Sequence, residues 1–70
     1  KMKYYILYGF ANSKSFRASK KFKTRNEAIN YAFRYLPLFT EVNEEIFKDK
    51  HTIEYVCNNY SSFTVSRQVA

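Results

Sequence analysis

Two segments near the start of the chain have the residue pattern of β-strands. Tyr4 to Phe10 is a dense run of β-forming residues, and Phe16 to Phe22 alternates aromatic or small residues with basic ones. The polar segment Ala11 to Ser15 lies between them. This arrangement predicts an antiparallel hairpin whose loop is Ala11 to Ser15.

The register of the predicted hairpin determines which side chains share a face. We expect Phe10 to lie opposite Phe16 across the loop. The same register places Tyr8 opposite Ala18 on the same face. The other face is then largely basic, and its members are Lys3, Tyr5, Leu7, Arg17, Ser19, Lys21 and Lys23.

A helix-capping signal follows the hairpin. The Thr24 hydroxyl can accept a hydrogen bond from the Glu27 amide, while the Glu27 carboxylate can accept one from the Thr24 amide. Because Pro37 disfavours helix at the residue before it, we predict a helix from Arg25 to Leu36. Its apolar stripe contains Ala28, Ile29, Ala32, Phe33 and Leu36. We expect the stripe to pack on Ile6, Tyr8 and Phe16.

The segment after Pro37 predicts a short second helix. Thr40 can cap it, and Val42, Ile46 and Phe47 form its apolar edge. Three acids suit the positive end of the helix dipole, namely Glu41, Glu44 and Glu45. An extended conformation from Leu38 to Val42 is the alternative.

A second hairpin completes the pattern. Thr52 to Cys57 and Phe63 to Val69 both alternate, and Asn58 to Ser62 has the Asn and Ser residues typical of turns. The order β, β, α, β, β predicts an α+β fold: a small four-stranded antiparallel sheet with one main helix packed on one face. With no internal repeat and no linker, we expect residues 1–70 to form a single domain.

Composition favours a folded protein in a reducing compartment. The chain is 46% hydrophobic with 7 Phe and 7 Tyr, unlike disordered chains, which contain few aromatics. The one cysteine, Cys57, can form no intramolecular disulfide, and no apolar run approaches the roughly 20 residues of a membrane span. The chain start also lacks a signal-peptide cleavage site. We therefore expect a cytoplasmic protein with no membrane partner, and the frequent Lys, Asn, Ile, Tyr and Phe indicate an AT-rich bacterial host or one of its phages.

Candidate catalytic groups are few. His51 lies in a polar turn without a positioned partner, and Cys57 alternates with apolar residues as a buried side chain does. Glu41 and Glu45 would share a helix face as a metal or acid pair, but a solvated first helical turn explains them as well. One His and one Cys cannot complete the usual metal site, and a single glycine excludes a glycine-rich phosphate loop. We expect no enzymatic activity, no metal and no cofactor, as the short length of 70 residues also suggests.

Charge is the most informative feature of the sequence. The formal net charge is +6, but residues 1–26 carry eight basic residues and no acid, whereas the remainder carries four basic residues and all six acids. A surface that is basic only for solubility usually mixes both signs. The uneven distribution therefore favours a binding surface in the first hairpin.

We predict that this surface contacts nucleic acid or an acidic protein surface. Its basic residues can contact phosphates and its tyrosine can stack on a base, and its members are Lys3, Tyr5, Lys14, Arg17, Lys21 and Lys23. The alternative is that the lysines protect an edge strand. A second candidate surface, suited to a protein interface, consists of Tyr31, Arg34 and Tyr35, although the tyrosines could instead rest on the sheet edge.

Two functions from different classes fit these observations. The first is a non-catalytic module that docks its basic hairpin on nucleic acid or another polyanion. The second is a small phage-type inhibitor that blocks a host or defence protein, such as a nuclease, at its nucleic-acid channel or an acidic patch. Both predict binding that weakens with salt, and neither determines the oligomeric state.

Overall fold

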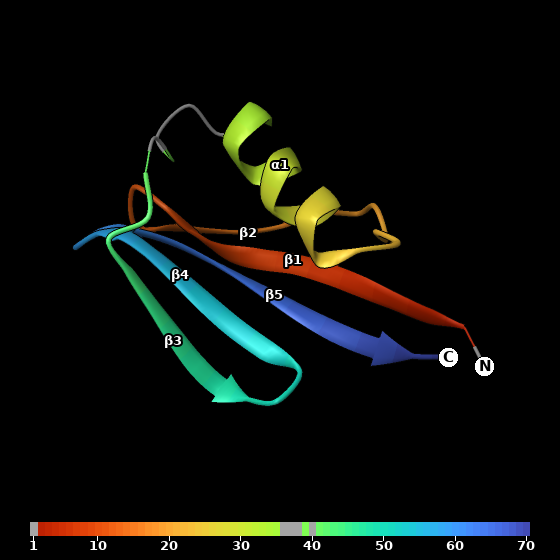
Figure 1. Ribbon diagram of the computed structural model, residues 1–70. Coiled ribbons are helices and arrows are strands. Elements are labelled where there is room, and N and C mark those ends of the chain that lie inside the picture. Colours follow the sequence, from red (N-terminus) through yellow and green to blue (C-terminus); the bar gives the residue numbers. More distant parts are fainter. Residues whose placement is uncertain (1, 36–38, 40) are drawn as a thin grey trace.

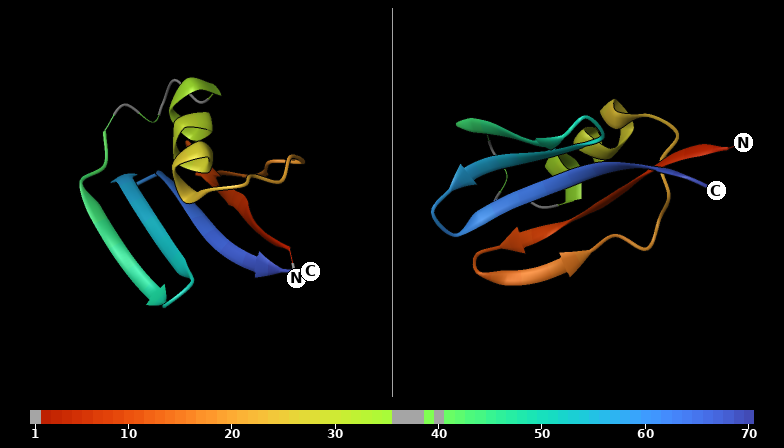
Figure 2. Two further views of the ribbon diagram at one scale, coloured as in Figure 1. Left: turned by 45° about the vertical axis from the view of Figure 1, so that its right-hand side comes forward. Right: turned by 90° about the horizontal axis from the view of Figure 1, so that it is seen from below.

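The computed structural model describes residues 2–35, 39 and 41–70, and in this part of the chain one helix lies across one face of a five-stranded antiparallel sheet (Figure 1). The elements are β1 (Lys3–Ala11), β2 (Lys14–Arg17), α1 (Arg25–Tyr35), β3 (Glu44–Asp49), β4 (Thr52–Asn58) and β5 (Ser61–Val69). Their order across the sheet is β2-β1-β5-β4-β3, so the first and last strands are neighbours. The views in Figure 2 show the twist of the sheet and the adjacent ends of β1 and β5.

The predicted α+β class, with an antiparallel sheet and a helix on one face, is confirmed, but the sheet has five strands rather than four. The prediction of a second helix is wrong because Glu44–Asp49 forms strand β3. Its proposed cap, Thr40, lies outside the described residues, as does Leu38 of the extended alternative. Pairing with β4 holds this segment in an extended conformation, and Glu45 lies opposite Tyr55 in the register. Two of the acids that suited a helix start, Glu44 and Glu45, instead make a charged sheet edge, which disfavours pairing with other chains.

The first hairpin forms, but its register differs by one residue from the prediction. The turn contains only Asn12 and Ser13, both with positive φ (53° and 69°), as in the type I′ turns that join twisted strands. Gly9 therefore lies opposite Phe16, where Phe10 was expected.

This shift moves side chains of β1 to the opposite face from the one predicted. Leu7 is fully buried beneath α1, whereas Ile6 and Tyr8 lie on the other side of the sheet. The predicted packing of the helix on Ile6 and Tyr8 is therefore wrong. Farther along, Phe22 pairs with Tyr5 in an isolated bridge and returns to the helix side.

Helix α1 begins at Arg25 as its capping signal predicts. Thr24 Oγ1 accepts a hydrogen bond from the Glu27 amide at 3.1 Å. The Glu27 carboxylate accepts from the amide of Lys23 at 3.0 Å, one residue earlier than expected. The described helix ends at Tyr35, and Leu36, the predicted last residue, lies outside the described residues.

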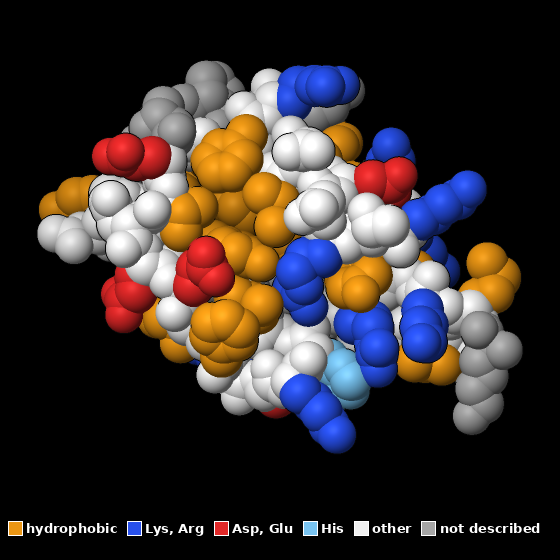
Figure 3. All heavy atoms as spheres, in the orientation of Figure 1, with side chains coloured by type: hydrophobic (Ala, Val, Ile, Leu, Met, Phe, Trp, Pro, Cys, Tyr) orange, Lys and Arg blue, Asp and Glu red, His pale blue; other side chains and the backbone are white. Residues whose placement is uncertain are grey.

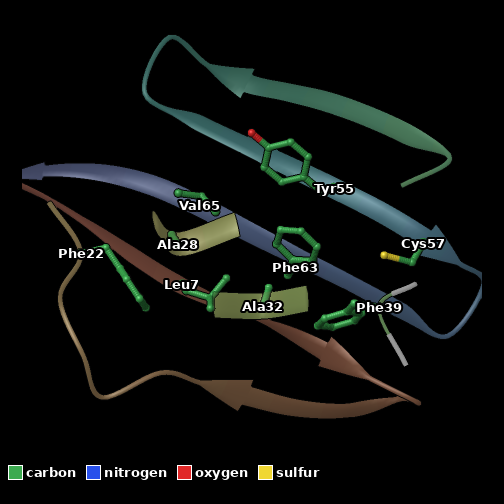
Figure 4. Packing of buried hydrophobic residues seen from close by; sticks show 9 residues of the cluster. All are labelled: Leu7, Phe22, Ala28, Ala32, Phe39, Tyr55, Cys57, Phe63 and Val65. Carbon is green, nitrogen blue, oxygen red and sulfur yellow. The ribbon is translucent and has the colours of Figure 1, made fainter. Parts of the chain in front are cut away.

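The core lies between α1 and the sheet and is largely aromatic (Figure 4). The ring centroid of Phe63 on β5 lies 5.1 Å from those of Tyr55 and Phe39, and 5.7 Å from that of Phe33. On α1, Ala28 and Ala32 are fully buried, and such small side chains allow the helix to approach the sheet closely. The buried cluster consists of Leu7, Phe22, Ala28, Ala32, Phe39, Tyr55, Cys57, Phe63 and Val65, with Ile29, Phe33 and Phe16 packed against it as expected.

Candidate binding surface

The sheet has a face that no described element covers. Because α1 lies on the side of Leu7 and Phe63, the alternate side chains of each strand point to the opposite side, which we call the open face (Figure 1). On β1 these alternate residues form an apolar ridge. The open-face ridge consists of Tyr4, Ile6, Tyr8 and Phe10.

The ridge is accessible along its length. Tyr4, Ile6 and Tyr8 are half-buried, and Phe10 is 53% exposed. The neighbouring strand offers small polar groups rather than apolar ones on this face. These groups lie on β5 and form a polar lane beside the ridge. The lane consists of Ser62, Thr64, Ser66 and Gln68, which lie opposite Phe10, Tyr8, Ile6 and Tyr4 in that order.

The hydroxyls of the β5 lane are packed between larger side chains. Thr64 and Ser66 are buried even though they face away from the helix. Ser66 Oγ lies 2.7 Å from Thr52 Oγ1 and accepts a hydrogen bond from Gln68 Nε2 at 3.1 Å. The lane is therefore a shallow polar floor with the aromatic ridge along one side.

Basic side chains flank the ridge on its β2 side. Arg17 lies opposite Tyr8 in the register and so shares its face. The Lys21 ammonium lies 4.6 Å from the ring centroid of Tyr4, within range of a cation–π interaction. These residues, together with Ile6, help to line a hollow of about 310 Å³. We call Arg17 and Lys21 the basic edge.

A second hollow lies at the other end of the ridge. It has a volume of about 400 Å³, and Phe10 and the exposed Tyr60 are among its lining residues. The turns that form it are tied together, since the Ser13 amide donates to the Tyr60 carbonyl at 2.8 Å and the Asn12 amide to Ser61 Oγ at 2.9 Å. The exposed rings of the open face, Phe10 and Tyr60, therefore lie at this end of the ridge, whereas Tyr4 at the other end is half-buried.

The far side of the open face is acidic. The register places Glu54 on β4 and Glu44 on β3 on this face. Lys48 Nζ lies 3.3 Å from Glu54 Oε1, which compensates one of the two acids. An anionic chain is therefore favoured along β1 on its β2 side and disfavoured over β3.

The structure divides the predicted binding residues between the two sides of the sheet. Arg17 and Lys21 lie on the open face, but Tyr5 lies on the helix side, where the Arg25 guanidinium is 5.3 Å from its ring centroid. Lys3 has the register of the helix side, and Lys14 pairs with Ala11 at the hairpin turn. Lys23 is exposed just before α1.

The ridge residues were absent from the predicted surface, since the predicted register turned them toward the core. The signal that could have revealed them is Asn12 followed by Ser13, because a two-residue turn at this point implies the observed register. The alternation of residues along β1 could not reveal which side faces the core, since Tyr5 and Leu7 on one side are as apolar as Tyr4 and Ile6 on the other.

The second predicted surface lies on the flank of α1. Tyr31 packs edge-on against Phe22, with ring centroids 5.0 Å apart, so it rests on the sheet edge as the alternative interpretation proposed. Arg34 is exposed and, with Tyr31 and Lys20, lines a groove of about 490 Å³. The side chain of Tyr35 lies outside what the structure describes.

The remaining candidate catalytic residues are Cys57 and His51. Cys57 is buried, and its burial raises the pKa of the thiol. Asp49 Oδ1 accepts the His51 amide at 2.7 Å, and this hydrogen bond is the main cause that lowers the pKa of the Asp49 carboxyl. Within residues 2–35, 39 and 41–70, no three His, Cys, Asp or Glu side chains come together in a way that could hold a metal ion.

Comparisons with protein-family models, with curated proteins and with solved structures find no match for this chain. In the described ranges, no helix has the length and apolar character needed to cross a membrane.

Proposed function

We propose that the protein is a non-catalytic module that binds single-stranded nucleic acid along β1 on the open face. The observation that carries this proposal is the juxtaposition of accessible rings with a positive charge that no described carboxylate pairs, since the half-buried Tyr8 and the exposed Phe10 lie beside Arg17. Aromatic side chains stack on bases of any sequence, and basic side chains neutralise phosphates. We expect the bases to contact the ridge and the phosphates to follow the basic edge.

Single strands fit this surface better than duplexes. Stacking on Tyr8 or Phe10 requires the face of a base, which is not accessible within a duplex. The distance along β1 from Tyr4 to Phe10 is about 20 Å, at roughly 3.3 Å per residue, which suits a short stretch of several nucleotides. Glu44 and Glu54 set the limit of the site on the opposite side.

The test compares two Phe→Leu substitutions on opposite faces of the sheet. Phe10→Leu removes a 53% exposed ring of the ridge, whereas Phe47→Leu removes a 69% exposed ring on the helix side of β3. Fluorescence anisotropy with labelled single-stranded and duplex oligonucleotides measures the affinity. We expect a loss of about fivefold or more from Phe10→Leu, because one stacked base contributes about 1–3 kcal/mol, and little change from Phe47→Leu.

Equal losses in the two variants, or tighter binding of duplex than of single strands, would contradict the proposal. Tyr8→Leu gives an independent second measurement on the ridge. Circular dichroism of each variant separates loss of binding from loss of folding.

A second candidate function is the inhibition of a host or defence protein. The groove beside Tyr31 and Arg34 supports it, because Tyr and Arg are common at the centres of protein interfaces. Nuclease-treated pull-downs distinguish the two functions: a partner retained without nucleic acid and lost in Arg34→Glu supports inhibition. Under either function we keep the expectation of a reducing, cytoplasmic compartment, which the free Cys57 supports.

A further inference from the structure

A second cluster of cationic groups lies on the helix side of the sheet, near the start of α1. The Arg25 guanidinium donates to the carbonyls of Val65 and His51, both at 2.9 Å. Arg67 Nη2 lies 3.4 Å from His51 Nε2, and the Arg67 amide donates to the same His51 carbonyl at 2.9 Å. Two guanidiniums and an imidazole therefore converge on one place in the fold.

Tyr5 forms the floor between these groups. Its ring lies 5.3 Å from Arg25 Cζ, and its register partner on β5 is Arg67. Lys3 continues on the same side of β1, and Lys50 directly precedes His51 in the chain. Figure 3 shows the histidine among Lys and Arg side chains on this face.

Neither guanidinium of this cluster is paired with a carboxylate in the described part of the chain, and the nearby Asp49 carboxylate accepts the His51 amide instead. Within the described residues the one ion pair joins Lys48 and Glu54, so neither guanidinium has a carboxylate within 4.0 Å. Arg67 Nε is buried without a hydrogen-bond acceptor. Buried polar groups are normally satisfied, so a guanidinium with one unsatisfied buried donor and no carboxylate partner favours an anion beside it.

We propose that Arg25, His51 and Arg67 form a binding site for a phosphate dianion. Guanidinium groups match the tetrahedral oxygens of phosphate with paired N–H donors, and such charge-assisted bonds are among the stronger ones in proteins. Arg25 is already oriented by the two carbonyls, so little side-chain entropy is lost when the anion binds. The sheet separates this site from the open face, and it therefore functions independently of the proposed nucleic-acid surface.

Two sources can supply this anion, namely free inorganic phosphate and the terminal phosphate of a small phosphomonoester. NMR titration of the arginine N–H groups and of the His51 ring, at constant ionic strength, measures binding of each probe. We use inorganic phosphate, a nucleoside 5′-monophosphate and the same nucleoside without phosphate. Saturable chemical-shift changes of Arg67 Nε–H and of the His51 ring with phosphate support the site. Tighter binding of the nucleoside monophosphate than of inorganic phosphate identifies a phosphomonoester as the source.

Substitutions test whether the shifts arise at this site. We expect Arg67→Gln to weaken phosphate binding about tenfold or more, because it removes a charged hydrogen-bond donor, and Arg67→Lys to weaken it less. Arg34→Gln on the exposed flank of α1 is the matched control and should have no effect. Arg17→Glu with Lys21→Glu, which acts on the open face, should also leave phosphate binding unchanged.

Three results would overturn the proposal: linear shifts without saturation, equal shifts with chloride at the same ionic strength, or the same affinity in Arg67→Gln. Each variant is first checked for native chemical shifts elsewhere in the sheet. Because Arg67→Lys retains the positive charge, it provides a folded comparison if Arg67→Gln does not fold.

Discussion

At the scale of single residues, Gly9 is the position on β1 that tolerates a side chain least. A Cβ atom there would lie 2.7 Å from Cα of Phe63 and even closer to the carbonyl oxygen of Ser62. Both are backbone atoms of the neighbouring strand, so they cannot rotate away as a side chain can. Glycine in a strand often marks such a close approach of two backbones.

We therefore expect Gly9→Ala to lower the free energy of unfolding by about 2–3 kcal/mol, the usual cost of overpacking a well-packed site. Ser15→Ala on β2, where the side chain is exposed, is the control and should change stability little. Urea denaturation followed by circular dichroism measures both. Equal stability of Gly9→Ala and the parent protein would mean that β1 and β5 are farther apart than the structure shows.

Cys57 gives a prediction about pH. Its burial raises the pKa of the thiol, so the folded state favours the neutral form more than the unfolded state does. The stability that this preference contributes is fully present below the unfolded pKa, about 8.5, and is lost as the pH rises through the raised folded pKa. Between about pH 8 and pH 10 the melting temperature should therefore fall more in the parent protein than in Cys57→Val. If the melting temperatures of the parent protein and of Cys57→Val fall equally with pH, the pKa of the thiol does not differ between the folded and unfolded states.

At the scale of elements, the turn between β1 and β2 determines the face on which the ridge lies. Asn12 tolerates positive φ, but Ser13, at φ 69°, carries a steric cost in the same region. The favoured type I′ sequence is Asn-Gly. We expect Ser13→Gly to raise the free energy of unfolding by about 0.5–1 kcal/mol.

Ser15→Gly is the matched control for this turn, because Ser15 lies within β2, where glycine weakens a strand. It should lower stability. Thermal unfolding of the two variants gives the comparison, and a destabilising Ser13→Gly would contradict the assigned turn.

The elements differ in how far local sequence could predict them. Helix α1 was predictable at its start because Thr24 and Glu27 are local signals that the structure uses. Strand β3 was not, because Glu44–Asp49 is extended through pairing with β4 and its own residues suit a helix start equally well. The general location of the first hairpin was predictable, but its two-residue turn was overlooked, and one residue of register exchanged the buried and exposed sides of β1.

At the scale of the whole molecule, the charge separation in the sequence becomes a separation in space. The basic first third includes β2, and the acidic remainder includes β3, and these are the two outer strands of the sheet. The sequence could predict that a basic surface exists and that Arg17 and Lys21 belong to it. It could not show that the rings beside Arg17 and Lys21 are Tyr8 and Tyr4 rather than Tyr5, because that depends on which side α1 covers.

This geometry makes the salt dependence of nucleic-acid binding a test of location as well as of charge. For single strands, log K falls with log salt concentration with a slope of about −0.7 for each phosphate contact. If Arg17 and Lys21 each contact a phosphate, then Arg17→Glu with Lys21→Glu should reduce the magnitude of the slope by about 1.4. The affinity at low salt should fall as well.

The control makes the same change in net charge elsewhere on the molecule. Arg34→Glu with Lys50→Glu alters the flank of α1 and the turn before β4, neither of which belongs to the basic edge. If only net charge mattered, the two double variants would lose affinity equally at every salt concentration. A localised surface instead requires the slope to change in the first variant and to remain that of the parent protein in the second. The reverse outcome would move the contact away from the basic edge. The single variants Arg34→Glu and Lys50→Glu would then distinguish the groove beside Tyr31 and Arg34 from the cluster at His51.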